Sequence, residues 1–572
     1  MFRGRLGESG STVLAFLALR DRIGDLIERL VAYACLSRDQ DTRVSGYQAM
    51  AGRATTLSVR AGEALSFADP ELLALPEGRL AALAAEEAGL AQYAHALDDV
   101  VRMRPHTLPE GEERLLAMSA DFGATPSVVY NMFHNADLRF GSVHDDEGNE
   151  VELTHARYAA YQKSRSRSVR EEAWRTLHAG YQRFENTLAA NLAGNVKRHV
   201  FAARARRYAS ALEAALDAES IPTEVYRNLV RTVRERIAPL HRYMEIRKKA
   251  LGLPALSPWD IAAPLTPEAI RKYPFDEAVE IVREGLAPLG ADYRAAFDEG
   301  IGGGWIDVYE SRGKRSGAYS WGAYSTKPYL LLNYNDTLDD LFTLAHEMGH
   351  SIHSLFTRRA QPYVYGGYSI FVGEVASTTN EALLIERLLA RAGGRVEEAT
   401  LLNHYLDQIR GTFFVQTMFA DFELAIHEAV EAGETLTATF LGDLFRKTYE
   451  VYHGPGFSPD PLLAAGWARI PHFYYNFYVY QYTTSYAAAT ALASRILAGD
   501  RETGARYMTL LESGSSDYPV RLLARAGVDL TRPEPILDTI ARFGALLDRF
   551  EPLILERGSA ARPGAAGAAP TR

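Results

Sequence analysis

The stretch His346-Glu347-Met348-Gly349-His350 decides how this chain is interpreted. It lies in an apolar run, residues 337–358, whose pattern predicts a helix. Residues four apart on a helix share one face, so His346 and His350 can both direct an imidazole at one metal ion. Glu347 lies about 100° round the helix, where it can reach a water molecule at the metal without being a ligand. This combination is typical of zinc peptidases.

A catalytic zinc site needs a third protein ligand. The three-histidine version of the motif would place a histidine six positions after His350, where this chain has Phe356. An acidic residue from a later helix is the alternative, and Glu374 and Glu381 lie on one face of the segment 372–382. Their apolar neighbours indicate burial, and a buried carboxylate needs a cation or a hydrogen bond. We predict Glu374 as the ligand and Glu381 as the hydrogen-bond acceptor of a ligand histidine.

A second group of polar aromatic residues lies in the segment 472–482. If this segment is a helix, four side chains share one face: His472, Tyr475, Tyr478 and Tyr482. Peptide hydrolysis develops negative charge on the carbonyl oxygen, and neutral O–H and N–H donors stabilise that charge. We therefore predict that this group binds the oxyanion. Tyr474 and Phe477 are predicted to belong to the core.

The composition excludes several classes of protein. The chain has 572 residues and 47% hydrophobic content, enough for two or more lobes. A net charge of −10, with acidic and basic residues interspersed, argues against nucleic acid as a partner. No segment has the run of about eighteen apolar residues that a membrane span needs, and the N-terminus lacks a signal-peptide pattern. The single cysteine, Cys35, favours the reducing cytoplasm and is expected to be a small buried residue.

Helical periodicity dominates the chain, so the predicted fold class is mainly α with a small sheet beside the metal helix. Short strands are predicted on either side of a turn at 145–149, and again at 305–309 and 329–334. We expect the strand 329–334 to present a free edge, to which a peptide substrate adds through main-chain hydrogen bonds. Three regions are predicted: an N-terminal helical region (1–185), a catalytic domain (186–558) and a disordered tail (559–572).

Taken together, these motifs resemble one family. The stretch 346–350, the segment around Glu374 and the aromatic segment are similar to those of the thimet-oligopeptidase-like zinc metallopeptidases, and within them to the oligoendopeptidase F group. The similarity covers roughly residues 40–555 and includes three further motifs: Asn135–Arg139, Glu150–His155 and Asn195–Phe201. Members of the family usually carry more chain before the position of Met1. We therefore expect either a misassigned start or an outer lobe without its first helix.

The resemblance implies two helical lobes around a deep channel, with one zinc ion at its floor. It implies hydrolysis of internal bonds in short peptides, because such a channel excludes folded proteins. By motif position, His346, His350 and Glu374 become the ligands and Glu347 the general base. His472 and Tyr482 become substrate contacts, and the parts of Tyr475 and Tyr478 stay open.

Two other functions are compatible with these motifs. A zinc carboxypeptidase on a similar helical scaffold would need a basic residue for the free carboxylate of its substrate. The candidates are Arg312, Lys314, Arg315 and Lys327. A peptide-binding protein without catalysis is the second alternative, but such a protein would have no use for Glu347.

Overall fold

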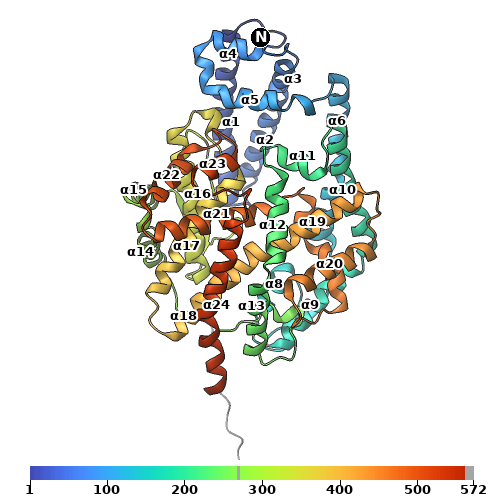
Figure 1. Ribbon diagram of the computed structural model, residues 1–572, viewed down its shortest axis with the longest axis vertical. Coiled ribbons are helices and arrows are strands. Elements are labelled where there is room, and N and C mark those ends of the chain that lie inside the picture. Colours follow the sequence, from blue (N-terminus) through green and yellow to red (C-terminus); the bar gives the residue numbers. More distant parts are fainter. Residues whose placement is uncertain (267–270, 561–572) are drawn as a thin grey trace, which may run out of the picture.

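The computed structural model describes residues 1–266 and 271–560, and it is mainly helical with two small sheets, as predicted (Figure 1). In this part of the chain, no helix combines the length and the apolar character needed to cross a lipid bilayer. The tail predicted to be disordered lies outside the described residues from 561 on, and residues 559 and 560 end the last helix. The boundary between residues 185 and 186 stays a prediction.

The N-terminal helices have a small core of their own, which includes Leu6, Val13 and Leu83. These helices are α1 (Gly10–Gln40), α2 (Ser45–Leu65), α3 (Ala68–Leu73), α4 (Arg79–Glu86) and α5 (Ala94–Arg102). Cys35 packs with three alanines between α1 and α2, so its prediction as a small buried residue is confirmed.

The helices from residue 125 onward share one large core, which runs from Tyr130 to Ile554. One side of Figure 1 holds α6 (Glu110–Gly123), α8 (His155–Tyr161), α9 (Arg167–Gln182), α10 (Glu185–Ala205), α11 (Ala211–Asp217), α19 (Val415–Glu431) and α20 (Ala438–His453). The helix α7 (Thr125–Met132) follows α6 and packs against α10. The middle holds α12 (Thr223–Glu235), α13 (Ala238–Ala250) and α24 (Glu534–Ala560). The other side holds α14 (Phe275–Gly285), α15 (Ala291–Gly302), α16 (Leu338–Ala360), α17 (Ile370–Ala390), α18 (Arg395–Ile409), α21 (Tyr480–Leu497), α22 (Arg501–Ser513) and α23 (Pro519–Arg525).

Both predicted groups of strands are present. β1 (Ser142–His144) and β2 (Glu150–Glu152) pair antiparallel around the predicted turn. The second sheet contains β3 (Ile306–Tyr309), β4 (Tyr319–Trp321) and β5 (Tyr329–Tyr334) in the order β3-β5-β4.

The prediction that the strand 329–334 presents a free edge is wrong. This strand is β5, the middle strand, which pairs parallel with β3 and antiparallel with β4. The physical reason lies in its composition, because Leu330, Leu331 and Leu332 form an unbroken apolar run and all three are buried. Such a run is typical of a strand that is covered on both faces. The edges of the sheet are β3 and β4.

The helix α16 begins at a capping box and meets α17 at a glycine. Thr337 accepts a hydrogen bond from the Asp340 N–H (3.1 Å), and the Asp340 carboxylate accepts one from the Thr337 N–H (3.0 Å). A Cβ atom built on Gly349 would lie only 2.7 Å from the Ser377 Cα atom on α17. Asn380 of α17 donates a hydrogen bond to the Ala345 carbonyl of α16 (3.0 Å). The two helices therefore approach more closely than any other residue at position 349 allows.

Replacing Gly349 by alanine should destabilise the protein and separate α16 from α17. We expect a loss of about 1–3 kcal/mol, because the new methyl group meets backbone that has no room to move. The matched control is Gly504→Ala on α22, where a Cβ atom has no neighbour within 4 Å. That change should be neutral or stabilising by up to about 1 kcal/mol, since alanine is the better helix former. Thermal unfolding midpoints of the two variants test this, and equal midpoints would contradict the packing argument.

Candidate active site

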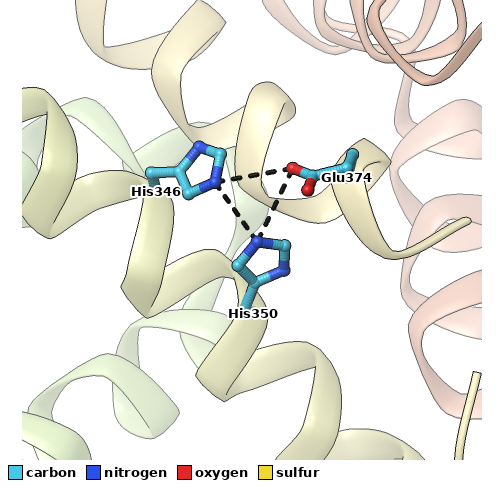
Figure 2. Close-up of side chains that lie close together, drawn as sticks. All are labelled: His346, His350 and Glu374. Carbon is cyan, nitrogen blue, oxygen red and sulfur yellow. Dashed lines mark hydrogen bonds and ion pairs between the residues drawn. The ribbon is translucent and has the colours of Figure 1, made fainter. Parts of the chain in front are cut away.

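Three side chains from α16 and α17 point at one spot, as Figure 2 shows. They are the predicted ligands His346, His350 and Glu374, whose nearest ligand atoms all lie within 4.8 Å of one another. The Nε2 atoms of the two histidines are 3.2 Å apart. The Glu374 Oε2 atom lies 3.4 Å from His346 Nε2 and 3.6 Å from His350 Nε2.

This donor set fits a zinc ion. Zinc takes nitrogen and carboxylate ligands at about 2.1 Å, and the edges of a tetrahedron of that size are about 3.4 Å long. The three measured separations, 3.2, 3.4 and 3.6 Å, agree with such edges. Three protein ligands leave a fourth position open, which is the arrangement of catalytic rather than structural zinc sites.

Further contacts orient each of the three side chains. Glu381 lies two turns after Glu374 on the same face of α17, and it accepts a hydrogen bond from His346 Nδ1. Gln408 of α18 donates to the other Glu381 oxygen. His350 makes a hydrogen bond to the Gly373 backbone, and Glu374 accepts one from Ser377 Oγ (2.9 Å). Contacts of this kind hold the tautomer and orientation of metal ligands. The sequence indicated Glu381 but gave no sign of Gln408, which lies 27 positions further along the chain.

The electrostatics of the group favour a bound cation. Burial lowers the pKa of His346, but the facing Glu381 carboxylate outweighs it and raises the pKa to about 9. Burial, reinforced by the positive charge of His346, lowers the pKa of His350, so its imidazole is free to act as a ligand. Two carboxylates beside a pair of histidines thus form a negative site that a divalent ion would neutralise.

Glu347 lies beside the ligand group and is only 8% exposed. Burial raises the pKa of its carboxyl group to about 7, with a further rise from the charge of Glu374. The Ser320 backbone of the edge strand β4 offsets part of this rise in the pKa of Glu347, and Ser320 Oγ lies 2.7 Å from Ser351 Oγ on α16. No motif in the sequence marked Ser320, because β5 separates it from the metal helix along the chain and only the folded sheet brings it to Glu347.

The predicted helix over residues 472–482 is wrong. Pro471–Tyr474 is a short 3-10 turn, and α21 begins only at Tyr480. Between them, Asn476 and Phe477 have positive φ angles of 49° and 57°, which an α-helix cannot contain. Two consecutive residues with left-handed φ angles interrupt the helix here, and helical spacing could not reveal them.

The four side chains nevertheless gather. The His472 ring centroid lies 5.7 Å from that of Tyr475, 6.1 Å from Tyr478 and 6.5 Å from Tyr482. The Tyr482 hydroxyl donates to the Tyr478 hydroxyl (3.2 Å). Tyr474 and Phe477 are buried, as predicted for core residues.

The helix α21 brings Tyr482 towards the ligand group. Ser485 Oγ, one turn further on, donates to the Phe371 carbonyl at the start of α17 (3.0 Å). Burial raises the pKa of Tyr482, its hydrogen bond to Tyr478 adds to the rise, and the nearby Glu374 carboxylate raises it further. Burial lowers the pKa of His472. Both groups are therefore neutral donors at neutral pH.

The basic residues considered for a substrate carboxylate are mostly engaged elsewhere. Lys314 binds the Asp307 carboxylate (3.0 Å), and Arg315 binds Asp39 of α1 (3.0 Å). Lys327 donates to the Gly303 and Gly304 carbonyls. Arg312 lines a separate cavity of about 440 Å³ beside the end of β3.

Comparison with known proteins identifies the family. Residues 160–542 match Peptidase family M3, and residues 71–140 match Oligopeptidase F. The chain is 43% identical to Oligopeptidase PepF of Bacillus subtilis over 97% of this chain and 83% of that protein. It is 41% identical to Group B oligopeptidase PepB of Streptococcus agalactiae, over 97% and 92% of the two chains.

A solved structure has the same fold. The oligoendopeptidase-F structure from Enterococcus faecium superimposes with a TM-score of 0.79 at 37% identity, covering 97% of this chain and 96% of that one. The predicted resemblance is therefore confirmed: the chain belongs to peptidase family M3 and is a peptidase of the oligoendopeptidase F kind.

Proposed function

We propose that this protein is a zinc-dependent endopeptidase that cleaves internal bonds of short, unstructured peptides. The observation that carries the proposal is the ligand group His346, His350 and Glu374 with the buried carboxyl group of Glu347 directly beside it. The donor atoms have zinc spacing, and Glu347 is left free for proton transfer. One zinc ion held there would activate a water molecule and polarise the scissile carbonyl.

In the proposed reaction, Glu347 acts as the general base. It takes a proton from the attacking water and passes that proton to the leaving amine. The influence of the Ser320 backbone on the pKa of Glu347 supports a position of this carboxyl group between the ligand helix and the edge strand. Substrate that lies along β4 would thus present its carbonyl carbon next to the base.

The edge strand β4, rather than β5, is the strand to which we propose that the substrate adds. Ser320, Trp321 and Gly322 line a cavity of about 500 Å³ that is bounded on its far side by α1. A sheet edge with space beside it can accept an extended peptide through main-chain hydrogen bonds. Recognition of this kind uses groups that every peptide has, and it therefore makes few demands on substrate sequence.

The aromatic group supplies the donors for the oxyanion. His472 and Tyr482 are neutral donors, and the effect of the Glu374 charge on the pKa of Tyr482 supports a place for Tyr482 on the side of the proposed ligand group. We assign stabilisation of the tetrahedral oxyanion to His472 and Tyr482. Tyr475 and Tyr478 extend the same surface, and Tyr478 orients the Tyr482 hydroxyl.

The alternatives have less support. Three of the four basic residues considered for a carboxypeptidase are held by other partners, and a pure peptide-binding protein would have no use for Glu347. We also propose the cytoplasm as the site of action, because a chain whose single cysteine is a buried packing residue suits a reducing compartment.

The protein should bind one zinc ion per chain, and Glu374→Ala should lose it. Glu381→Gln should weaken zinc binding about 10–100-fold, because His346 loses the acceptor that holds its tautomer. The matched control is Glu386→Gln on the same helix, whose side chain pairs with Arg542 instead. Elemental analysis and chelator competition test this. Full zinc in Glu374→Ala would remove that residue from the site.

Glu347→Gln should retain zinc and lose hydrolysis by at least about 10²-fold. The amide keeps the shape of the side chain but cannot accept the proton of the attacking water. Zinc content and turnover are measured on the same preparation, so that loss of metal is separated from loss of the base. Turnover near that of the wild type would show that another group is the base.

A peptide of about ten residues, blocked at both ends, should be cut at an internal bond. Strand addition uses backbone groups along the peptide rather than its terminal charges. Mass spectrometry of the products tests this, with a folded globular protein and its peptic fragments as a paired control. Only the fragments should be cut. Release of single residues from one end, or loss of activity on the blocked peptide, would favour the carboxypeptidase.

His472→Ala and Tyr482→Phe should lower kcat far more than they raise KM, since donors to an oxyanion act in the transition state. Each substitution should raise the activation free energy of hydrolysis by about 3–4 kcal/mol. Tyr480→Phe is the control on the same helix, because that side chain is buried in the core. Unchanged kinetics for both His472→Ala and Tyr482→Phe would mean that the aromatic group is structural.

A further inference from the structure

The segment 472–482 has an inner face and an outer face. Phe473, Tyr474 and Phe477 are buried, whereas the four polar aromatic residues of the proposed oxyanion group lie on the accessible side. The left-handed turn at Asn476 and Phe477 creates this division. Phenylalanine is unfavourable in that conformation, so the surrounding structure must hold it there.

Glu423 of α19 provides that hold. Its Oε1 atom accepts a hydrogen bond from the Phe477 backbone N–H at 2.6 Å, and the side chain is completely buried. Within the described part of the chain, the other carboxyl oxygen has no hydrogen-bond partner. Burial raises the pKa of Glu423 to about 8, so the group is mainly a neutral acid at neutral pH. A buried acid with a single backbone partner is unusual, because buried polar groups normally have all their bonding capacity met.

The ring of Phe477 packs against two other aromatic rings. It lies 4.3 Å from the His427 ring and 5.5 Å from the Tyr226 ring, measured between centroids. His427 donates from Nδ1 to the Glu423 carbonyl (2.8 Å) and accepts at Nε2 from His199 Nδ1 on α10 (3.1 Å). Burial lowers the pKa of His427 to about 4 and that of His199 to about 2, so both rings are neutral and their tautomers follow from these contacts.

The helix α10 holds the same segment at a second place. Asn195 donates to the Phe473 carbonyl (3.3 Å), and Asn191 donates to the Tyr474 hydroxyl (3.1 Å). Asn195 and His199 belong to the motif 195–201, which the zinc site leaves without a role. Both helices thus contact the inner face of the segment, and the His199–His427 hydrogen bond joins them behind it.

We propose that Glu423 is a positioning residue: its hydrogen bond to the Phe477 N–H holds the left-handed turn and thereby orients His472 and Tyr482 towards the reacting carbonyl. The inference rests on the proposed role of His472 and Tyr482. It adds a residue that contacts neither the zinc ligands nor any member of the oxyanion group.

Three variants test the proposal. Glu423→Met keeps the length of the side chain but removes the acceptor, whereas Glu423→Gln keeps a neutral acceptor of the same shape. Asp421→Asn is the matched control, a buried carboxyl group on the same helix that pairs with Arg234. Zinc content, kcat, KM and amide hydrogen exchange over residues 472–482 are measured for each.

For Glu423→Met we expect kcat to fall on the order of 10-fold or more, with KM within about threefold of the wild-type value. Zinc should stay at one per chain, and amide exchange over residues 472–482 should become severalfold faster. Glu423→Gln should restore kcat and slow exchange to within about threefold of the wild type. Asp421→Asn should match the wild type throughout.

Unchanged amide exchange over residues 472–482 in Glu423→Met would overturn the proposal. Faster exchange with an unchanged kcat would also overturn it. So would a Glu423→Gln variant whose kcat and exchange rates are no closer to the wild type than those of Glu423→Met. If Glu423→Met does not fold, the wild-type protein still decides: a Phe477 amide that exchanges as fast as an exposed one overturns the proposal. A wild-type protein that cleaves no peptide would refute the proposed function, while the exchange data would still show whether Glu423 holds the turn.

Discussion

The close contact between α16 and α17 at Gly349 is the constraint on which the site depends. Both histidines proposed as metal ligands lie on α16 and the proposed carboxylate ligand lies on α17, so their spacing is set by the distance between two helix backbones. A glycine lets those backbones meet, and the Asn380 hydrogen bond to Ala345 holds them in register. Interiors packed this tightly change in discrete steps rather than gradually. The ligand geometry is therefore a property of the helix pair before any metal binds.

Local patterns predicted much of the structure. The helical spacing of His346 and His350, the half-buried positions of Glu374 and Glu381 among apolar residues, and the mainly helical class all agree with the folded chain. Each of these follows from residues within a few turns of one another, where periodicity and burial are readable. The same applies to Cys35, whose small apolar neighbours already indicated a packed position.

Features that depend on distant contacts were not predictable. The order of the three-stranded sheet places β5 in the middle because β3 and β4 reach it from opposite sides, and no local pattern encodes that order. The turn at Asn476 and Phe477 is stabilised by Glu423, more than fifty positions earlier, so helical spacing gave the right group of residues for the wrong reason. Gln408 and Ser320 likewise reach the site only through tertiary packing.

The position of the ligands along the chain has a consequence for assembly. His346 and Glu374 are 28 positions apart, on consecutive helices, so a short loop closure brings them together at little entropic cost. The segment 472–482 and its support on α19 come much later in the chain, and contacts of that separation form slowly. During synthesis from the N-terminus, the helix pair that carries the proposed metal ligands is therefore complete well before the proposed donors for the oxyanion emerge. On the proposed function, binding of the metal ion and competence for hydrolysis would thus be separate steps in the maturation of this chain.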